Sequence, residues 1–221
     1  MASVRIEARG RSRDHSAGER LADAIVHAVG ILAGIAGAVL LIQLTLNYNP
    51  GRVAGVGVYS AGLIAMLGSS ATYNICYGTR FRDVLRRFDH SAIFLMIAGT
   101  YTPFVVTYYD SARAIAIAGL VWSLSAAGIA IRIFRPDIFD RINVALYLVL
   151  GWIAVIVIGP LLLTVSAFTG TALLLGGTLY TAGVPFHIRE HLRFQNAIWH
   201  VFVLAAAICH YFAVLDGVAL S

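Results

Sequence analysis

Seven long apolar stretches, separated by short polar segments, set the strongest limit on how this chain can fold. A helix needs about 20 apolar residues to cross the roughly 30 Å hydrocarbon core of a bilayer. The fifth and sixth stretches nearly merge, and six spans is therefore the alternative count. Pro160 and residues 166–170 indicate where the two stretches part. We expect the spans at about 22–46, 53–77, 90–109, 112–134, 142–163, 169–185 and 197–215.

Composition supports an all-α membrane protein. The chain has 221 residues, of which 59% are hydrophobic and 12% charged. An ordinary soluble domain carries about 25% charged residues, so this chain has too little polar surface to cover a globule in water. The first apolar stretch follows about 20 polar residues, which is not the layout of a secretory signal. Cys76 and Cys209 fall inside apolar stretches and are expected to be free, buried thiols.

The arginines fall almost entirely on one side of the predicted membrane. Lysine is absent, and only Arg52 and Arg113 fall on the side opposite the N-terminus. The positive-inside rule then puts the N-terminus in the cytoplasm and the C-terminus outside, which requires an odd number of spans. We predict a cytoplasmic arginine-rich tail at 1–20 and a seven-helix transmembrane domain at 21–217, in the plasma membrane. The arginine clusters are too short and too scattered to indicate binding of nucleic acid. The cytoplasmic set is Arg5, Arg9, Arg11, Arg13, Arg20, Arg80, Arg82, Arg86, Arg87, Arg132, Arg135, Arg141, Arg189 and Arg193.

Polar side chains within the apolar stretches are the candidate functional residues, because an ionisable group in a span is costly and usually faces the bundle interior. The predicted topology brings Asn74, Asp89, Asn196 and His200 to one depth near the cytoplasmic face. His210 would lie about 15 Å further out at 1.5 Å per residue. Such a cluster is typical of a metal or proton-handling site, and the alternative is a structural hydrogen-bond network worth about 1 kcal/mol per bond. The full set is His27, Ser70, Asn74, Asp89, His90, Asn196, His200 and His210.

Small residues follow one stripe of the first and the sixth spans. Gly30, Gly34 and Gly37 recur at helix-contact spacing, and Gly176, Gly177 and Gly183 do so later in the chain. Such stripes let helices approach closely in lipid. Packing within the bundle is the favoured interpretation, and dimerisation is the alternative.

Several strings match the pattern of one family. They are Asp89–Ile93, Ile97–Pro103 and Trp199–Leu204 with His210 following, and more loosely Glu19, His27–Gly30 and Gly176–Tyr180. These strings resemble the hemolysin III family, which is related to the adiponectin and progestin receptor group and, more remotely, to the alkaline ceramidases. The resemblance implies a seven-helix bundle with a zinc site near the cytoplasmic face. It also implies a lipid bilayer as the setting and a lipid as ligand or substrate.

The resemblance implies zinc ligands at Asn74, Asn196 and His200, with Asp89 holding a water molecule and Ser70 beside them. Family members usually carry histidine at the first two positions, and this chain has asparagine at both. A neutral amide oxygen is a poor ligand for Zn²⁺, so the asparagines favour a metal-free polar network. Recruiting His27 or His90 as substitute ligands would strain the expected geometry.

Three functions remain open from the sequence. The first is a non-enzymatic role in membrane or lipid homeostasis, or as a cytolysin as the family name implies. The second is a metal-dependent lipid amide or ester hydrolase, in which Asp89 positions water, His200 ligates the metal and Ser70 assists the oxyanion. The third is an ion or proton transporter with a relay through Asp89, His200 and His210.

Overall fold

A computed structural model describes residues 16–76, 79–157, 159–189 and 191–221 and contains seven long helices among them. The arginines at positions 5, 9, 11 and 13 lie outside the described residues. A short 3₁₀ segment (η1, Gly159–Leu163) separates α5 from α6, and a short segment (η2, Leu215–Ala219) continues α7. The long helices are α1 (Ala17–Thr45), α2 (Pro50–Ile75), α3 (Arg82–Tyr108), α4 (Ser111–Phe134), α5 (Pro136–Val157), α6 (Ala167–Ile188) and α7 (Gln195–Val214).

Polar side chains fix where several helices begin. Ser16 accepts a hydrogen bond from the Glu19 backbone N–H while the Glu19 carboxylate accepts one from the Ser16 N–H, a complete capping box for α1. Asn49, Asp110 and Ser166 cap α2, α4 and α6 by the same chemistry. These caps explain why the helices start a few residues before the apolar stretches from which they were predicted.

The start of α3 corrects one expectation. We predicted a span from about residue 90, opening on Asp89 and His90, whereas α3 begins at Arg82. Asp83 lies in the first turn, where a carboxylate interacts favourably with the helix N-terminus. Asp89 and His90 therefore lie about two turns inside the helix, and not at its end.

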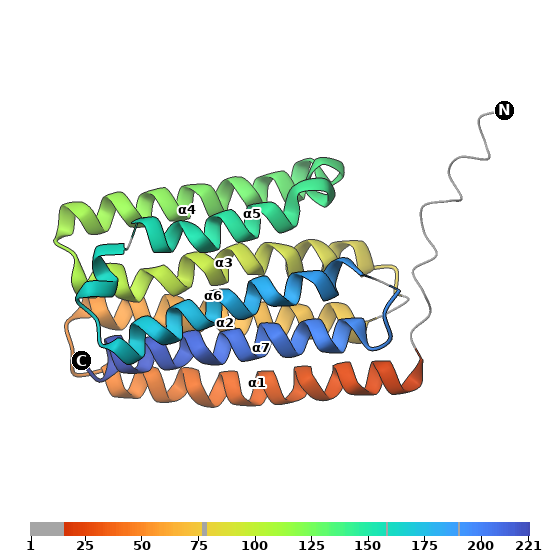
Figure 1. Ribbon diagram of the computed structural model, residues 1–221, viewed down its shortest axis with the longest axis horizontal. Coiled ribbons are helices and arrows are strands. Elements are labelled where there is room, and N and C mark those ends of the chain that lie inside the picture. Colours follow the sequence, from red (N-terminus) through yellow and green to blue (C-terminus); the bar gives the residue numbers. More distant parts are fainter. Residues whose placement is uncertain (1–15, 77–78, 158, 190) are drawn as a thin grey trace.

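The long helices pack side by side along one axis (Figure 1). The start of α1 lies at one end of the bundle together with the α2–α3, α4–α5 and α6–α7 connections, and the C-terminus lies at the other end. Six helices, α1 to α4, α6 and α7 with η2, are long and apolar enough to cross a membrane. The polar first turns of α5 carry Asp137, Asp140 and Arg141. The arginine-bearing connections thus gather at the end where α1 begins, hereafter the arginine-rich end.

Glycines allow α2 and α3 to pack closely. A Cβ atom on Gly55 would lie 2.8 Å from Val106 and 3.0 Å from the Cα atom of Pro103, and one on Gly62 would lie 3.2 Å from the Leu95 carbonyl oxygen. The stripe in α1 also packs inside the bundle, since Gly34 faces Leu67 of α2. These contacts favour packing within one chain over dimerisation as the role of the small residues.

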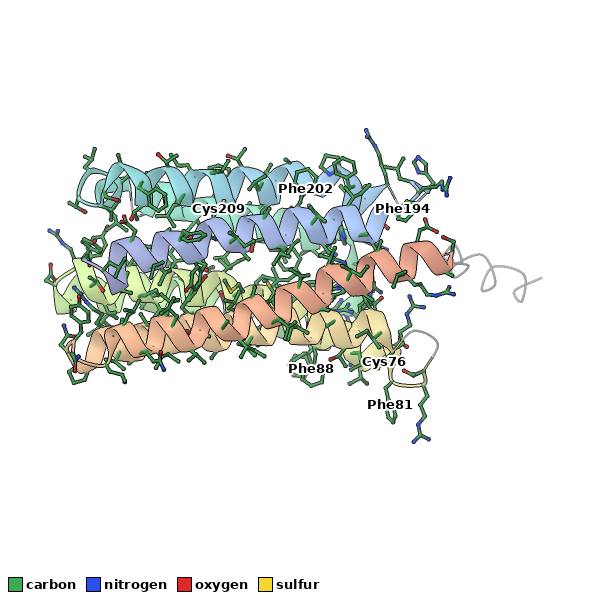
Figure 2. All side chains as sticks on the ribbon, turned by 90° about the horizontal axis from the view of Figure 1, so that it is seen from below. Cys76, Phe81, Phe88, Phe194, Phe202 and Cys209 are labelled. Atoms are coloured by element: carbon green, nitrogen blue, oxygen red, sulfur yellow. The ribbon has the colours of Figure 1, made fainter. Side chains whose placement is uncertain are left out.

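Large apolar side chains cover the outside of the bundle. Leu32, Ile115 and Val149 are 71%, 73% and 62% exposed, which suits helices surrounded by lipid. Figure 2 shows the two thiols on different helices and well apart, Cys76 at the end of α2 and Cys209 within α7. Both cysteines are free, as predicted, but they are half-buried and not buried as we expected.

The end of the chain is tied to the end of the bundle opposite the arginine-rich end. The Asp216 carboxylate accepts hydrogen bonds from the hydroxyls of Ser166, at 2.5 Å, and Thr169, at 2.6 Å. The guanidinium of Arg52 donates to the Ser221 carbonyl oxygen at 2.9 Å. The α1–α2 connection, the start of α6 and the C-terminus therefore meet at this end.

Candidate functional site

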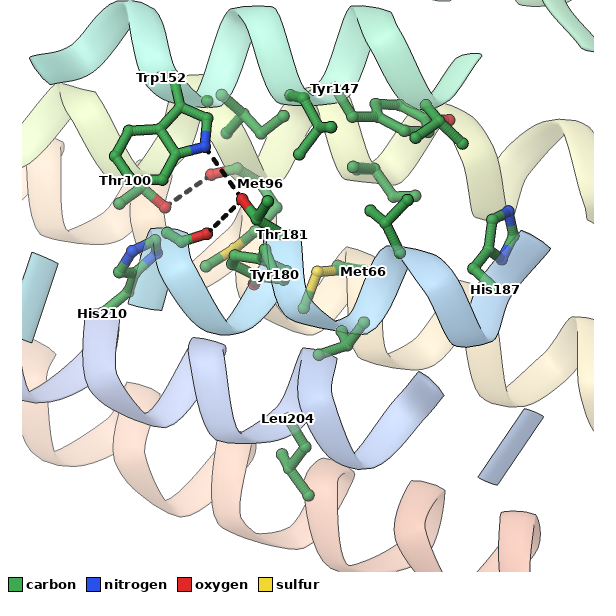
Figure 3. A pocket seen from close by; sticks show the side chains of 18 of the residues that line it. Met66, Met96, Thr100, Tyr147, Trp152, Tyr180, Thr181, His187, Leu204 and His210 are labelled. Carbon is green, nitrogen blue, oxygen red and sulfur yellow. Dashed lines mark hydrogen bonds between the residues drawn. The ribbon is translucent and has the colours of Figure 1, made fainter. Parts of the chain in front are cut away.

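An internal cavity of about 220 Å³ runs through the middle of the bundle. Apolar side chains line most of its length, including Met66 of α2, Met96 of α3 and Leu204 of α7. Figure 3 shows His187 toward one end of this cavity and His210 toward the other. The Trp152 indole donates to the Thr181 hydroxyl at 3.0 Å, so the polar atoms on this part of the wall are paired.

A polar cluster lies at the arginine-rich end of the cavity, where α1 meets α7. Oδ1 of Asp23 is 2.5 Å from Nδ1 of His200, and Oδ2 of Asp23 is 3.4 Å from Nε2 of His27. The His27 and His200 rings lie 4.4 Å apart between centroids. Asp23 and His27 are 7% and 5% exposed, so both groups are shielded from solvent.

The hydrogen-bonding capacity of this cluster is only partly used. An ionised carboxylate can only accept, so the short contact with Asp23 requires the proton on Nδ1 of His200. Nε2 of His27 is buried and has no hydrogen-bond partner among the described residues, and its 3.4 Å approach to Oδ2 of Asp23 is an ion-pair distance and not a hydrogen bond. A buried nitrogen left in this way is costly and marks a place where a ligand would bind favourably.

Asp89 and Ser70 face the same cavity as His27 and His200. The Asp89 carboxyl is in side-chain hydrogen-bond contact with Ser70, and it lies close enough to His200, His27 and the buried Arg132 to interact with their charges. Ser70, which the family resemblance put beside the site, therefore lies next to Asp89 in this cavity. The site brings carboxylate and imidazole groups from several helices together at one end of a mainly apolar cavity.

Asn74 and Asn196 line a second pocket, of about 210 Å³. Asp23 and His27 also line it, so the cluster lies between the two cavities. The Asn74 side-chain amide donates to the Ser70 carbonyl oxygen at 2.9 Å, which secures the end of α2. The structure therefore divides the predicted four-residue set between two cavities: Asp89 and His200 line the first, and the asparagines line the second. Metal binding at those four positions stays a prediction.

The other two predicted histidines differ in their surroundings. Nε2 of His210 lies 3.3 Å from the Leu173 carbonyl oxygen. The His90 ring packs against Phe139, and its buried Nδ1 has no hydrogen-bond partner among the described residues; only its backbone carbonyl accepts a hydrogen bond, from the Tyr147 hydroxyl at 3.0 Å. His27, in contrast, has a carboxylate and a second imidazole as neighbours.

Asp23 is the residue that our sequence analysis missed. It lies inside the first predicted span and one helical turn before His27, a spacing that puts both side chains on one face of α1. The rule that selected the other ionisable residues in apolar stretches selects Asp23 as well. Glu19, one turn earlier, accepts a hydrogen bond from the Phe194 backbone N–H at 2.9 Å and so anchors α1 beside the start of α7.

Comparisons with known proteins agree with this architecture. The "Hemolysin-3 homolog" of Bacillus subtilis is 34% identical over 89% of this chain and 93% of its own length, and "Hemolysin-3" of Bacillus cereus is 31% identical over 89% and 90%. The human "Monocyte to macrophage differentiation factor" is 27% identical over 89% of this chain and 83% of its own. No solved structure was found to match. The model of the family described as "Haemolysin-III related" matches residues 19–211, and the chain therefore belongs to the hemolysin III family.

Proposed function

We propose that this protein is a seven-span plasma-membrane protein that binds a lipid inside its helix bundle and acts in membrane or lipid homeostasis. The N-terminal end of α1 lies in the cytoplasm and the C-terminus lies outside. The acyl chain of the lipid occupies the apolar part of the cavity that His27, Asp89 and His200 line, and its polar head group lies beside these three residues. The proposal rests on one observation: a single cavity combines an apolar wall with an ionisable group of residues at one end.

The proposed topology is supported by the distribution of arginines. The connections at the arginine-rich end contain Arg80, Arg135, Arg189 and Arg193, while Arg52 and Arg113 belong to the other end. A cytoplasmic location for the arginine-rich end follows from the positive-inside rule. Six helices qualify as spans on length and composition, and α5, with 22 residues, is long enough to be the seventh.

Lipid binding is tested by filling the cavity. Val144 lines the cavity from α5, whereas Val149 on the same helix is 62% exposed and faces outward. In detergent at low concentration, native mass spectrometry of the wild-type protein is expected to show a retained lipid. The Val144→Trp protein is expected to lose this lipid, and the matched Val149→Trp protein is expected to keep it. Equal retention in both variants, or no retained lipid in the wild type, would refute the proposal.

Hydrolysis of a lipid amide or ester is a second candidate function, favoured by the contact between Ser70 and Asp89 beside His200. Asp89 would orient the attacking water, and Ser70 would support the developing oxyanion. A bound zinc would supply Lewis-acid chemistry at such a site. The test is product release from ceramide-like and ester lipids by the wild type and by Asp89→Asn. Loss of turnover with lipid binding retained would support hydrolysis, and absence of turnover in the wild type would exclude it for those substrates.

Cytolysis is a further role that the names of the Bacillus relatives bring to this chain. Release of haemoglobin from red cells by the purified protein measures it directly. We expect none at concentrations where the protein binds lipid, because the described residues form one bundle whose exposed apolar faces suit a resident membrane protein.

A further inference from the structure

The cluster of Asp23, His27 and His200 has the arrangement of a metal-ligand set. Each side chain offers one ligand atom, and these atoms all lie within 4.8 Å of one another. The ligands come from two helices at opposite ends of the sequence, α1 and α7. The Glu19 contact with the Phe194 backbone holds these helices together one turn away.

The donor set suits a divalent transition metal. Two imidazoles and one carboxylate form a three-ligand site with room for a fourth ligand, an arrangement that zinc adopts where it binds small molecules. Imidazole selects zinc and its neighbours in the first transition row over calcium and magnesium, which prefer oxygen. The amide side chains of Asn74 and Asn196 are poorer donors for the same ion.

Burial and charge point to the same ion. The Asp23 carboxylate is 7% exposed, and the Asp89 carboxylate faces the same cavity as His27 and His200. Two carboxylates near one buried site favour a doubly charged cation. The buried Nε2 of His27 has no hydrogen-bond partner among the described residues, and a metal ion would use its lone pair.

We propose that Asp23, His27 and His200 together bind a divalent transition metal, with zinc the best fit, so that the metal centre of this chain uses α1 and α7. The ligand set differs from the Asn74, Asn196 and His200 set that the family resemblance implies, and it keeps only His200. The metal takes the place of the proton that lies between Nδ1 of His200 and Asp23 in the metal-free contact, since ligands bind metals in their deprotonated form. This inference does not depend on lipid binding, so either proposal can fail alone.

The test uses the full chain purified in detergent, stripped with a chelator and then titrated with Zn²⁺ and Co²⁺. We expect one metal per chain by elemental analysis, a Co²⁺ visible spectrum typical of four or five nitrogen and oxygen ligands, and a rise in the unfolding temperature with metal concentration. In Asp23→Asn, His27→Gln and His200→Gln the affinity for Zn²⁺ is expected to fall by more than about tenfold. Loss of a residue that only hydrogen-bonds to a metal ligand already costs about this much, and loss of the ligand itself should cost more.

Matched controls separate this site from other histidines and from the asparagine positions. His210→Gln changes a histidine on α7 that contacts the Leu173 carbonyl. Asn74→Ala and Asn196→Ala change the two metal-ligand positions that the family resemblance implies. All three variants are expected to keep the metal. No saturable binding by the wild type would overturn the proposal. Unchanged affinity in Asp23→Asn and His27→Gln would also overturn it. If a ligand variant does not fold, the Co²⁺ spectrum of the wild type decides, because octahedral, water-rich coordination would contradict a three-ligand site.

Discussion

Nδ1 of His200 on α7 lies 2.5 Å from Oδ1 of Asp23 on α1, so a single charged contact joins the first and last helices of the bundle inside its apolar interior. Both residues are largely shielded, with side chains 12% and 10% exposed. A polar contact in such surroundings is costly to break, because the group that remains is left without a partner.

We predict strong energetic coupling between Asp23 and His200. Asp23→Ala should lower the free energy of unfolding by about 1.5–3 kcal/mol, the range for hydrogen bonds to charged groups. In a double-mutant cycle with His200→Ala, the coupling should exceed about 0.5 kcal/mol. Thermal unfolding of metal-free protein in detergent measures both values.

Asp137→Ala is the control for an exposed ion pair. The Asp137 carboxylate lies 4.0 Å from the Arg135 guanidinium, and both side chains are more than 60% exposed, so this change should lower the free energy of unfolding by less than about 1 kcal/mol. Additive effects of the two single changes would contradict the prediction.

A second prediction concerns the close approach of α2 to α3. A Cβ atom on Gly55 would lie 3.0 Å from the Pro103 Cα atom, and backbone at this distance cannot move aside easily. Gly55→Ala should therefore destabilise the protein by about 1–3 kcal/mol, as overpacking usually does. Gly57→Ala, on the same helix with nothing within 4 Å, should be neutral or stabilising by up to about 1 kcal/mol. Chemical unfolding in mixed micelles measures the pair, and equal stability of the two variants would show that the α2–α3 contact tolerates the added methyl.

A third prediction concerns the buried arginine near the arginine-rich end. Arg132 is 3% exposed, and its guanidinium lies 3.2 Å from Asp140, which also contacts Arg86. Asp140→Ala should be more destabilising than Arg132→Met, because the first change leaves a buried cation uncompensated and the second removes it. We expect a loss of about 1–3 kcal/mol for Asp140→Ala. Unfolding temperatures of the two proteins provide the comparison. The reverse order would mean that Arg132 contributes mainly through its contact with the Phe139 ring.

A fourth prediction concerns orientation. Alkaline phosphatase fused after Ser221 should be active in a bacterial host, and green fluorescent protein fused there should be dark, because the C-terminus is proposed to lie outside. Fusions after Arg193, in the α6–α7 connection, should give the opposite pair of signals. Signals from the same compartment at both positions would contradict the proposed topology and the count of seven spans.

The fold could be predicted largely from the sequence, because long apolar stretches and arginine clusters depend only on local composition. The break between α5 and α6 was marked by Pro160 and Ser166, and the structure has η1 and a capped helix start there. The early start of α3 was missed because its first two turns are polar and helix formation there does not require lipid. Hydropathy alone cannot detect such an extension.

The candidate site was only partly predictable. Depth in the membrane follows from counting residues, and this put Asn74, Asp89, Asn196 and His200 at one level; of these, Asp89 and His200 line the same cavity. The rotation of each helix about its axis depends on packing with its neighbours, and this rotation directs Asn74 and Asn196 to a separate pocket. Asp23 was detectable as an ionisable residue in an apolar stretch, but its partner His200 lies 177 positions away, and only the packing of α1 against α7 brings them together.

X-ray absorption spectroscopy of the zinc-loaded protein distinguishes a metal held by Asp23, His27 and His200 from one bound elsewhere. We expect a first shell of nitrogen and oxygen ligands at about 2.0–2.2 Å with the outer-shell scattering of two imidazoles, reduced to one imidazole in His27→Gln. A shell with only one imidazole in the wild type, or a spectrum unchanged by His27→Gln, would show that the metal does not bind to Asp23, His27 and His200.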